Sequence, residues 1–135
     1  MGIEKTIPTS VGKLHRADHF EDRIAERGLS RDDIAKTVNE GAEIEDSEPT
    51  VRKFTHIEDG IRFAVVIDST IGGYDWSEID PDTKRYSLVT AWASVENEDI
   101  ARSDESRWSD NFVLMTKRSD ERYEQRTGRK AGVIQ

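Results

Sequence analysis

The feature of this sequence that most constrains its fold is the stretch DHFEDRIAERGLS at residues 18–30. Phe20 and Ile24 are four residues apart, so both would lie on one face of an α-helix. Gly28 can adopt the positive φ angle that ends such a helix. We therefore expect a first helix over residues 15–27, closed by a tight turn.

A second helix should follow directly. Ser30 is a suitable N-cap, and Asp33 stands where a capping box places a carboxylate. Ile34 and Val38 are four residues apart and would form the buried pair of this helix. The pattern predicts a helix over residues 30–40, so the N-terminal part of the chain should offer two amphipathic helices to whatever follows.

Beyond these helices the apolar spacing changes to that of β-strands. Residues 51–57 alternate and are rich in β-forming side chains, while residues 61–67 and 85–95 are apolar enough for central strands. Asp59-Gly60 is a hairpin signal between the first two. Residues 69–84 are polar and predict a long hairpin loop before the last of these strands.

The C-terminal part is more polar. Residues 96–110 hold six acidic and two basic side chains, which is typical of a solvated loop or linker. The short apolar run at residues 112–116 is either a last strand or the start of a helix. Ser119 is a suitable cap for a short helix through Arg126, and Gly128 would end it.

These elements predict an α+β fold, with two N-terminal helices packed on an antiparallel sheet of three to four strands, and a C-terminal extension. We expect three regions along the chain. They are an N-terminal arm at 1–14, a domain at 15–95, and a segment at 96–135 that joins an acidic loop and a short apolar stretch to a basic helical tail.

Composition narrows the class of protein. The chain has no cysteine, so disulfides and thiolate metal sites are excluded. It lacks a run of about 20 apolar residues, the length of a membrane span, and its N-terminus has no signal-peptide pattern. We therefore expect a protein with no membrane association that is cytoplasmic or carried within a virion.

The net charge of −8 opposes nonspecific nucleic-acid binding, because phosphates repel an acidic surface. High salt weakens this objection, because the screening length falls to about 3 Å at 1 M. The many acidic side chains would suit a salt-adapted host.

The charge is unevenly distributed along the chain. Residues 117–130 hold six basic and three acidic side chains, a net charge of +3, so the remainder of the chain carries −11. Such a basic tail predicts a protein partner.

Two kinds of chemistry are open to these residues. His15 and His19 have the i, i+4 spacing of metal ligands on a helix, but a solvated polar face explains that spacing better, and we expect neither metal nor cofactor. RNA cleavage through the ribose 2′-hydroxyl needs no metal. It needs a group that moves a proton, typically histidine, and cations that stabilise the charged phosphorane.

The chain offers residues of these types on three predicted elements. Hydroxyl and aromatic side chains would orient the phosphate and stack a base. Each residue also has an ordinary structural reading as a flank, ion-pair or core residue. The candidates are His19 and Arg23 on the first helix, Arg52, Lys53 and His56 on the first long strand, and Thr90 and Trp92 on the last.

The pattern His19-x-x-x-Arg23-x-x-x-Arg27-Gly28-Leu29-Ser30-x-x-Asp33-Ile34, followed by Leu88-Val-Thr-Ala-Trp92, resembles the small toxin-like nuclease domains of the barnase–EndoU–colicin–RelE group. The same pattern also resembles uncharacterised domains found beside BrnT-like toxins and as phage-encoded nucleases. The resemblance covers residues 15–95. It implies a metal-independent ribonuclease in which His19 and Thr90 are catalytic, Arg52 or Lys53 is the basic strand residue, and Arg23 assists with the phosphate.

Three readings of function remain open. The first is a toxin-type RNA endonuclease acting on RNA. The second is a non-enzymatic component of a viral particle or another complex, which docks on an acidic neighbour through residues 117–130. The third is a toxin-like protein whose His19 face is covered by an antitoxin partner. The first requires His19, a strand Arg or Lys, and Thr90 to converge.

Overall fold

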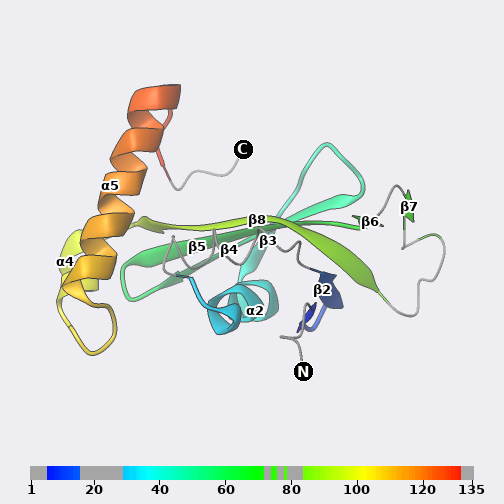
Figure 1. The fold of residues 1–135 in the computed structure, drawn as a ribbon, viewed down its shortest axis with the longest axis horizontal. Helices are drawn as coiled ribbons and strands as arrows, with labels where there is room; N and C mark the ends of the chain where they lie inside the picture. The colour runs from blue at the N-terminus through cyan, green and yellow to red at the C-terminus, as the bar shows by residue number, and fades with distance from the viewer. Residues whose placement is uncertain (1–5, 16–28, 72–73, 76–77, 79–83, 132–135) are drawn as a thin grey trace.

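The computed structural model describes residues 6–15, 29–71, 74–75, 78 and 84–131. Six strands form one sheet in the order β1–β2–β8–β5–β4–β3 (Figure 1). The sheet strands are β1 Thr6–Pro8, β2 Lys13–His15, β3 Ala42–Ile44, β4 Val51–Glu58, β5 Ile61–Asp68 and β8 Arg85–Val95. Strands β6 Thr70–Ile71 and β7 Tyr74–Asp75 form a separate pair. The helices among the described residues are α2 Arg31–Glu40, α4 Glu98–Arg102 and α5 Asp110–Thr127.

The sheet is mixed. The pairs β3–β4, β4–β5, β5–β8 and β1–β2 are antiparallel. Strand β2, however, runs parallel to β8. The β4–β5 hairpin turns at Asp59 and Gly60, both with positive φ, which confirms the predicted Asp-Gly hairpin.

The predicted fold class is therefore wrong in its architecture, although the α+β class holds. Instead of three to four antiparallel strands, the sheet has six, because β1 and β2 lie within the segment expected to be an irregular arm and a helix start. Strands of three residues are too short to show a period in the sequence. His15 ends β2 rather than beginning a helix, and the rest of the predicted first helix, 16–27, lies outside the described residues.

Helix α2 forms as its sequence predicts. The Ser30 hydroxyl accepts a hydrogen bond from the backbone N–H of Asp33 at 3.1 Å, and the Asp33 carboxylate accepts one from the backbone N–H of Ser30 at 3.0 Å. This capping box satisfies two N–H groups at the helix N-terminus. Ile34 and Val38 are buried and pack against the sheet, with α2 lying along one face of it (Figure 1).

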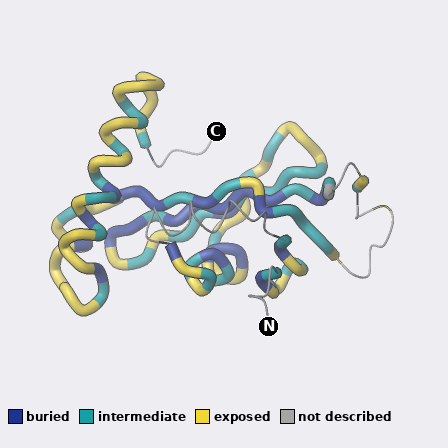
Figure 2. The backbone as a smooth tube through the Cα atoms, in the orientation of Figure 1, coloured by how far each residue is buried: buried dark blue, intermediate teal, exposed yellow. Residues whose placement is uncertain are grey.

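The hydrophobic core lies between α2 and that face. Side chains from β1, β2, β5 and β8 join those of α2 there, and the buried segments run along the middle of the sheet (Figure 2). Leu14 and Ile61 are 0% exposed. We call this side of the sheet the helix face and the other side the opposite face.

The C-terminal segment is helical over more of its length than expected. The acidic stretch contains α4 and a buried tryptophan, Trp108, that extends the core. The predicted short strand or helix and the tail helix form one helix, α5, capped by Ser109 and ended by Gly128 at φ 70°. The prediction of a solvated loop over residues 96–110 was wrong, because Ala101 and Trp108 are buried in the core. The sequence did not indicate this, because polar and charged residues separate these two buried side chains.

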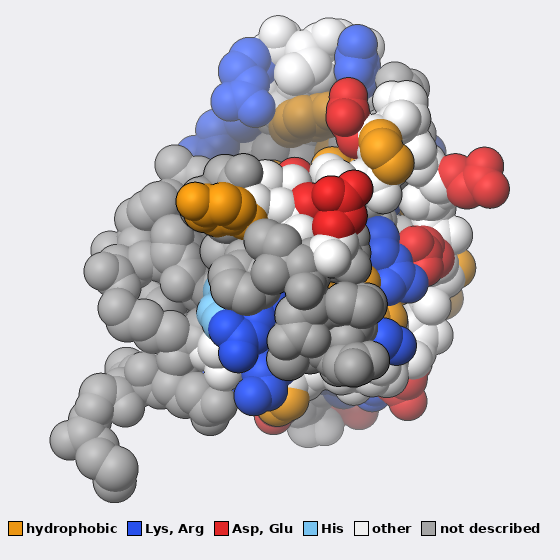
Figure 3. Space-filling model, turned by 90° about the vertical axis from the view of Figure 1, so that its right-hand side faces the viewer, with side chains coloured by type: hydrophobic (Ala, Val, Ile, Leu, Met, Phe, Trp, Pro, Cys, Tyr) orange, Lys and Arg blue, Asp and Glu red, His pale blue; other side chains and the backbone are white. Residues whose placement is uncertain are grey.

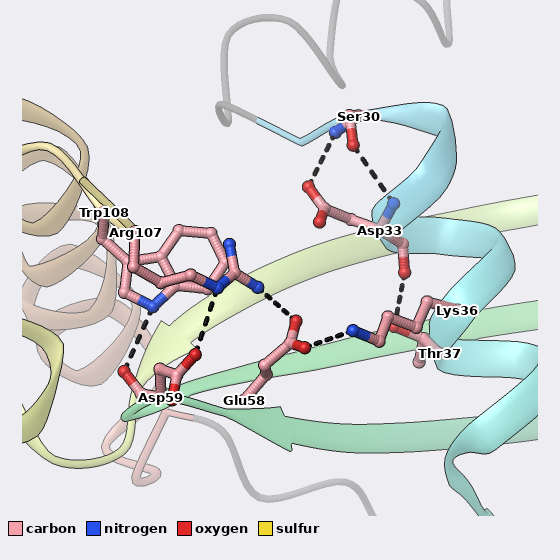
Figure 4. A network of polar contacts seen from close by, with 8 residues as sticks. All are labelled: Ser30, Asp33, Lys36, Thr37, Glu58, Asp59, Arg107 and Trp108. Carbon is pink, nitrogen blue, oxygen red and sulfur yellow. Dashed lines mark hydrogen bonds and ion pairs between the residues drawn. The ribbon is translucent and has the colours of Figure 1, made fainter. Parts of the chain in front are cut away.

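A charged network ties three elements together at the β4–β5 hairpin (Figure 4). Glu58 accepts hydrogen bonds from Lys36 of α2 and from Arg107 of the loop before α5. Arg107 also donates to Asp59 at 3.1 Å and lies 3.7 Å from the ring centroid of Trp108. The network therefore fixes α2 and the α4–α5 segment to the same end of the sheet.

Helix α5 is fastened to β8 through Asp120, whose carboxylate accepts a hydrogen bond from the backbone N–H of Val95 at 2.9 Å. Burial, followed by the nearby charges of Glu124 and Glu121, raises the pKa of Asp120 to about 6. The folded protein therefore binds a proton here more tightly than the unfolded chain. This group stabilises the fold below its unfolded pKa of about 4, and that stabilisation is lost as the pH rises through about 6.

We expect Asp120→Asn to raise the free energy of unfolding by about 1–2 kcal/mol at pH 7.5, after discounting for partial exposure, and to change it little at pH 4. The amide oxygen keeps the bond to Val95 but carries no charge. Urea unfolding at the two pH values measures this, with exposed Glu105→Gln as the control of equal charge change. A loss of stability at both pH values would contradict the assignment.

No helix among the described residues is long and apolar enough to cross a bilayer.

Candidate functional site

The strand register decides which predicted site residues share a surface. Successive side chains of a strand point to opposite faces of the sheet. Phe54 of β4 pairs with Val65 of β5, which pairs with Ala91 of β8, and all three belong to the core on the helix face. Their neighbours along the chain therefore occupy the opposite face.

The predicted site residues are divided between these faces. Arg52 and His56 lie two residues either side of Phe54 and so belong to the helix face. Lys53 and Thr90 both register with Val66 and lie in one row on the opposite face. Trp92, two residues beyond Thr90, is on that face as well. His19 and Arg23 lie outside the described residues.

Arg52 is held in a structural cluster rather than presented to a ligand. Its guanidinium forms two hydrogen bonds with the Glu43 carboxylate, at 2.9 and 2.6 Å, and a third with the Tyr86 hydroxyl at 3.2 Å. It also stacks near the rings of Phe54 and Tyr86. These bonds raise the pKa of Arg52 and lower that of Glu43. Arg52 and Lys53, the two candidates for the basic strand residue, therefore lie on opposite faces of the sheet.

Lys53 and Thr90 are brought onto one surface, but Lys53 has a protein partner. Its ammonium lies 2.6 Å from the Asp46 carboxylate, and both side chains are mostly buried. Hydrogen bonds from Lys53 and from the backbone of Glu48 lower the pKa of Asp46. Lys53 therefore holds the β3–β4 loop against the sheet, and phosphate binding by Lys53 would have to compete with Asp46.

The imidazole that the structure does place on the opposite face is His15. Leu14, its neighbour in β2, is fully buried in the core, so His15 and Lys13 point to the other side. The parallel register pairs His15 with Ser87 and Lys13 with Arg85. His15 therefore lies on the strand next to β8, on the same face as Thr90.

The surroundings of His15 favour its neutral form. Burial, then the positive charges of Arg85 and Lys13, lower the pKa of His15. Its Nε2 atom is buried and has no hydrogen-bond partner among the described residues. Lys and Arg side chains gather around a histidine on the side of the molecule where β2 and the start of β8 lie (Figure 3). A neutral imidazole beside two cations can accept a proton next to a bound anion.

Sequence reasoning missed this group because it placed His15 at the start of a helix, where its partner would have been His19. The signal was present in the alternation of Lys13, Leu14 and His15, but three residues do not distinguish a strand from a turn. Lys13 and Arg85 are 72 positions apart, and only the parallel pairing of β2 with β8 joins them.

Among the described residues, no group of three or more acidic or histidine side chains could hold a metal ion. No protein-family model matches the chain, and neither a curated protein nor a solved structure does.

Proposed function

We propose that this protein is a metal-independent RNA endonuclease-like domain whose site lies on the opposite face of the sheet, around His15. The observation that carries the proposal is the juxtaposition of His15, Lys13 and Arg85 across the β2–β8 pair, with the His15 imidazole kept neutral. The resemblance of residues 15–95 to small toxin-like nucleases supports the same chemistry.

Each described residue has a role in this proposal. His15 takes the proton from the ribose 2′-hydroxyl, which attacks phosphorus as the bond to the 5′-oxygen breaks. Lys13 and Arg85 stabilise the negative charge that grows on the phosphorane oxygens. Thr90 and Trp92 lie further along the same face, where a hydroxyl can orient the phosphate and an indole can stack a base. The departing 5′-oxygen takes a proton from a general acid or from water; His19, which the sequence predicts as acid or base, lies outside the described residues.

The test is cleavage of a labelled single-stranded RNA by the purified chain in EDTA, at low and at high salt. We expect products from RNA and none from a DNA of the same sequence, because DNA lacks the 2′-hydroxyl. Activity should be retained at high salt, where screening weakens the repulsion between RNA and an acidic protein. Absence of RNA products at every salt concentration would refute the proposal.

A second candidate function is that of a non-enzymatic component of a viral particle or another complex. The observation that favours it is the C-terminal half of α5, which extends past the sheet and is largely exposed (Figure 2). An RNA-inactive protein that still associates through α5 would support this reading over the first.

A further inference from the structure

The outward side of α5 carries a row of side chains at four-residue spacing, Leu114, Arg118, Arg122 and Arg126. Side chains four apart lie above one another on a helix. The helix packs on β8 through the buried Val113 and Thr116, so Leu114, Arg118 and Arg122 point away from the sheet. All four residues of this row are exposed, Leu114 by 39%. We call these four residues the arginine row.

Among the described residues, no carboxylate forms an ion pair with the arginines of the arginine row. Lys117, on a neighbouring side of α5, is paired with Glu98 at 3.0 Å. In the described part of the chain, by contrast, neither Arg118 nor Arg122 has an ion-pair partner. Like charges four residues apart on a helix repel each other. A ligand of opposite charge would remove this repulsion.

Acidic side chains lie along the segment from the end of α2, through the edge strand β3, to the β3–β4 loop. Residues 40–50 hold five acidic side chains and no basic one. Glu43 and Asp46 are paired with Arg52 and Lys53, whereas Glu40, Glu45 and Glu48 are exposed and have no ion-pair partner among the described residues. We call Glu40, Glu45 and Glu48 the acidic edge.

The position of Glu40 in the acidic edge is electrostatically unfavourable, although Lys36 lies close enough to interact with its charge. Glu40 is the last residue of α2, and the last turn of this helix has no basic residue. A carboxylate at that position faces the negative end of the helix dipole. Carboxylates beside an edge strand oppose strand-to-strand pairing, but they leave a surface that cationic side chains of a helix can contact.

We infer that the arginine row of α5 docks on the acidic edge of a second copy of this chain. Charge complementarity between two surfaces of one chain carries the inference, and the apolar Leu114 in the row favours a protein partner over a phosphate backbone. α5 lies at one end of the sheet and the β3–β4 loop toward the other (Figure 1), so one copy cannot close the contact on itself. Two different surfaces then meet, and such a contact builds rings or open chains of copies.

The inference rests on the docking helix of the second candidate function and is independent of RNA cleavage. The test is the mass of the full chain by light scattering and sedimentation, over a range of protein concentrations at low and high salt. We expect association that weakens with salt, because the contact is made by exposed charges. A chain that stays monomeric at low salt at all concentrations would overturn the inference.

Charge reversal identifies the surfaces. Arg118→Glu with Arg122→Glu, or Glu45→Lys with Glu48→Lys, should each weaken association by about tenfold or more, because like charges then oppose each other. The four substitutions in one chain should restore it. Lys84→Glu is the control, since it reverses an exposed positive charge elsewhere and should leave association intact.

Two results would refute this docking mode. In the first, the fourfold variant stays as weak as either double variant, so the two surfaces do not meet. In the second, the arginine-row variant keeps the mass of the wild type but loses affinity for a labelled RNA, so that the row binds nucleic acid instead. The RNA-cleavage assay is run in parallel, and its outcome does not enter this test.

Discussion

Replacing His15 by glutamine is expected to lower the rate of RNA cleavage by about 10²–10⁴-fold, the usual contribution of a general base. Glutamine keeps a polar side chain of similar reach in β2 but cannot take up the proton of the 2′-hydroxyl. Because the pKa of His15 is lowered, the wild-type rate should fall only when the pH drops below the usual histidine range. Single-turnover rates across pH 5–9 measure both effects.

The matched control is His56→Gln. His56 lies in β4 on the helix face, registered with the buried Phe63, and cannot share a surface with His15. We expect the RNA-cleavage rate of His56→Gln and its pH profile to match those of the wild type. Circular dichroism would show that both the His15 and the His56 variants fold. Equal rate losses in the two variants would show that neither histidine acts specifically and would contradict the assignment of His15.

Replacing Trp108 by alanine is expected to lower the free energy of unfolding by about 3–5 kcal/mol, the usual cost of a large buried aromatic. Trp108 is 8% exposed and packs against Phe63 and Phe112, with ring centroids 5.7 and 5.3 Å apart. Its indole N–H donates to the backbone carbonyl of Asp59 at 3.1 Å. The substitution leaves a cavity in the core and also removes the hydrogen-bond donor of the Asp59 carbonyl.

Urea unfolding followed by far-ultraviolet circular dichroism measures this loss without depending on tryptophan fluorescence. Ile100→Ala is the control, because Ile100 lies in the neighbouring α4 but is 50% exposed, and we expect a change within about 0.5–1 kcal/mol. If the two variants lost similar stability, Trp108 would not be the anchor of the C-terminal segment.

The parts of the fold that could be predicted from the sequence are those whose contacts are local. The capping box of Ser30 and Asp33 joins residues three positions apart, and the Asp59-Gly60 turn needs positive φ at adjacent residues. The buried pair Ile34 and Val38 follows from helical spacing alone. In each case the physical cause lies within one or two turns of chain, so the residue pattern carries it.

The candidate site was less predictable because its members come from distant segments. Lys53 and Thr90 were expected together, and their strands do place them in one row. Arg52, one residue from Lys53, was expected there too, but the alternation of the strand turns it to the other face. A period of two residues makes such adjacent candidates mutually exclusive once the register is set.

Residue patterns along the chain were enough to predict a mixture of helix and sheet, the positions of α2 and of the β4–β5 hairpin, and a basic C-terminal tail on an acidic body. The parallel pairing of β2 with β8, which brings Lys13 and His15 beside Arg85, and the outward direction of the α5 arginines could be read only from the folded chain. The reason is that pairing between strands far apart in sequence depends on burial of a shared core, to which short segments such as Lys13–His15 contribute no recognisable pattern of their own.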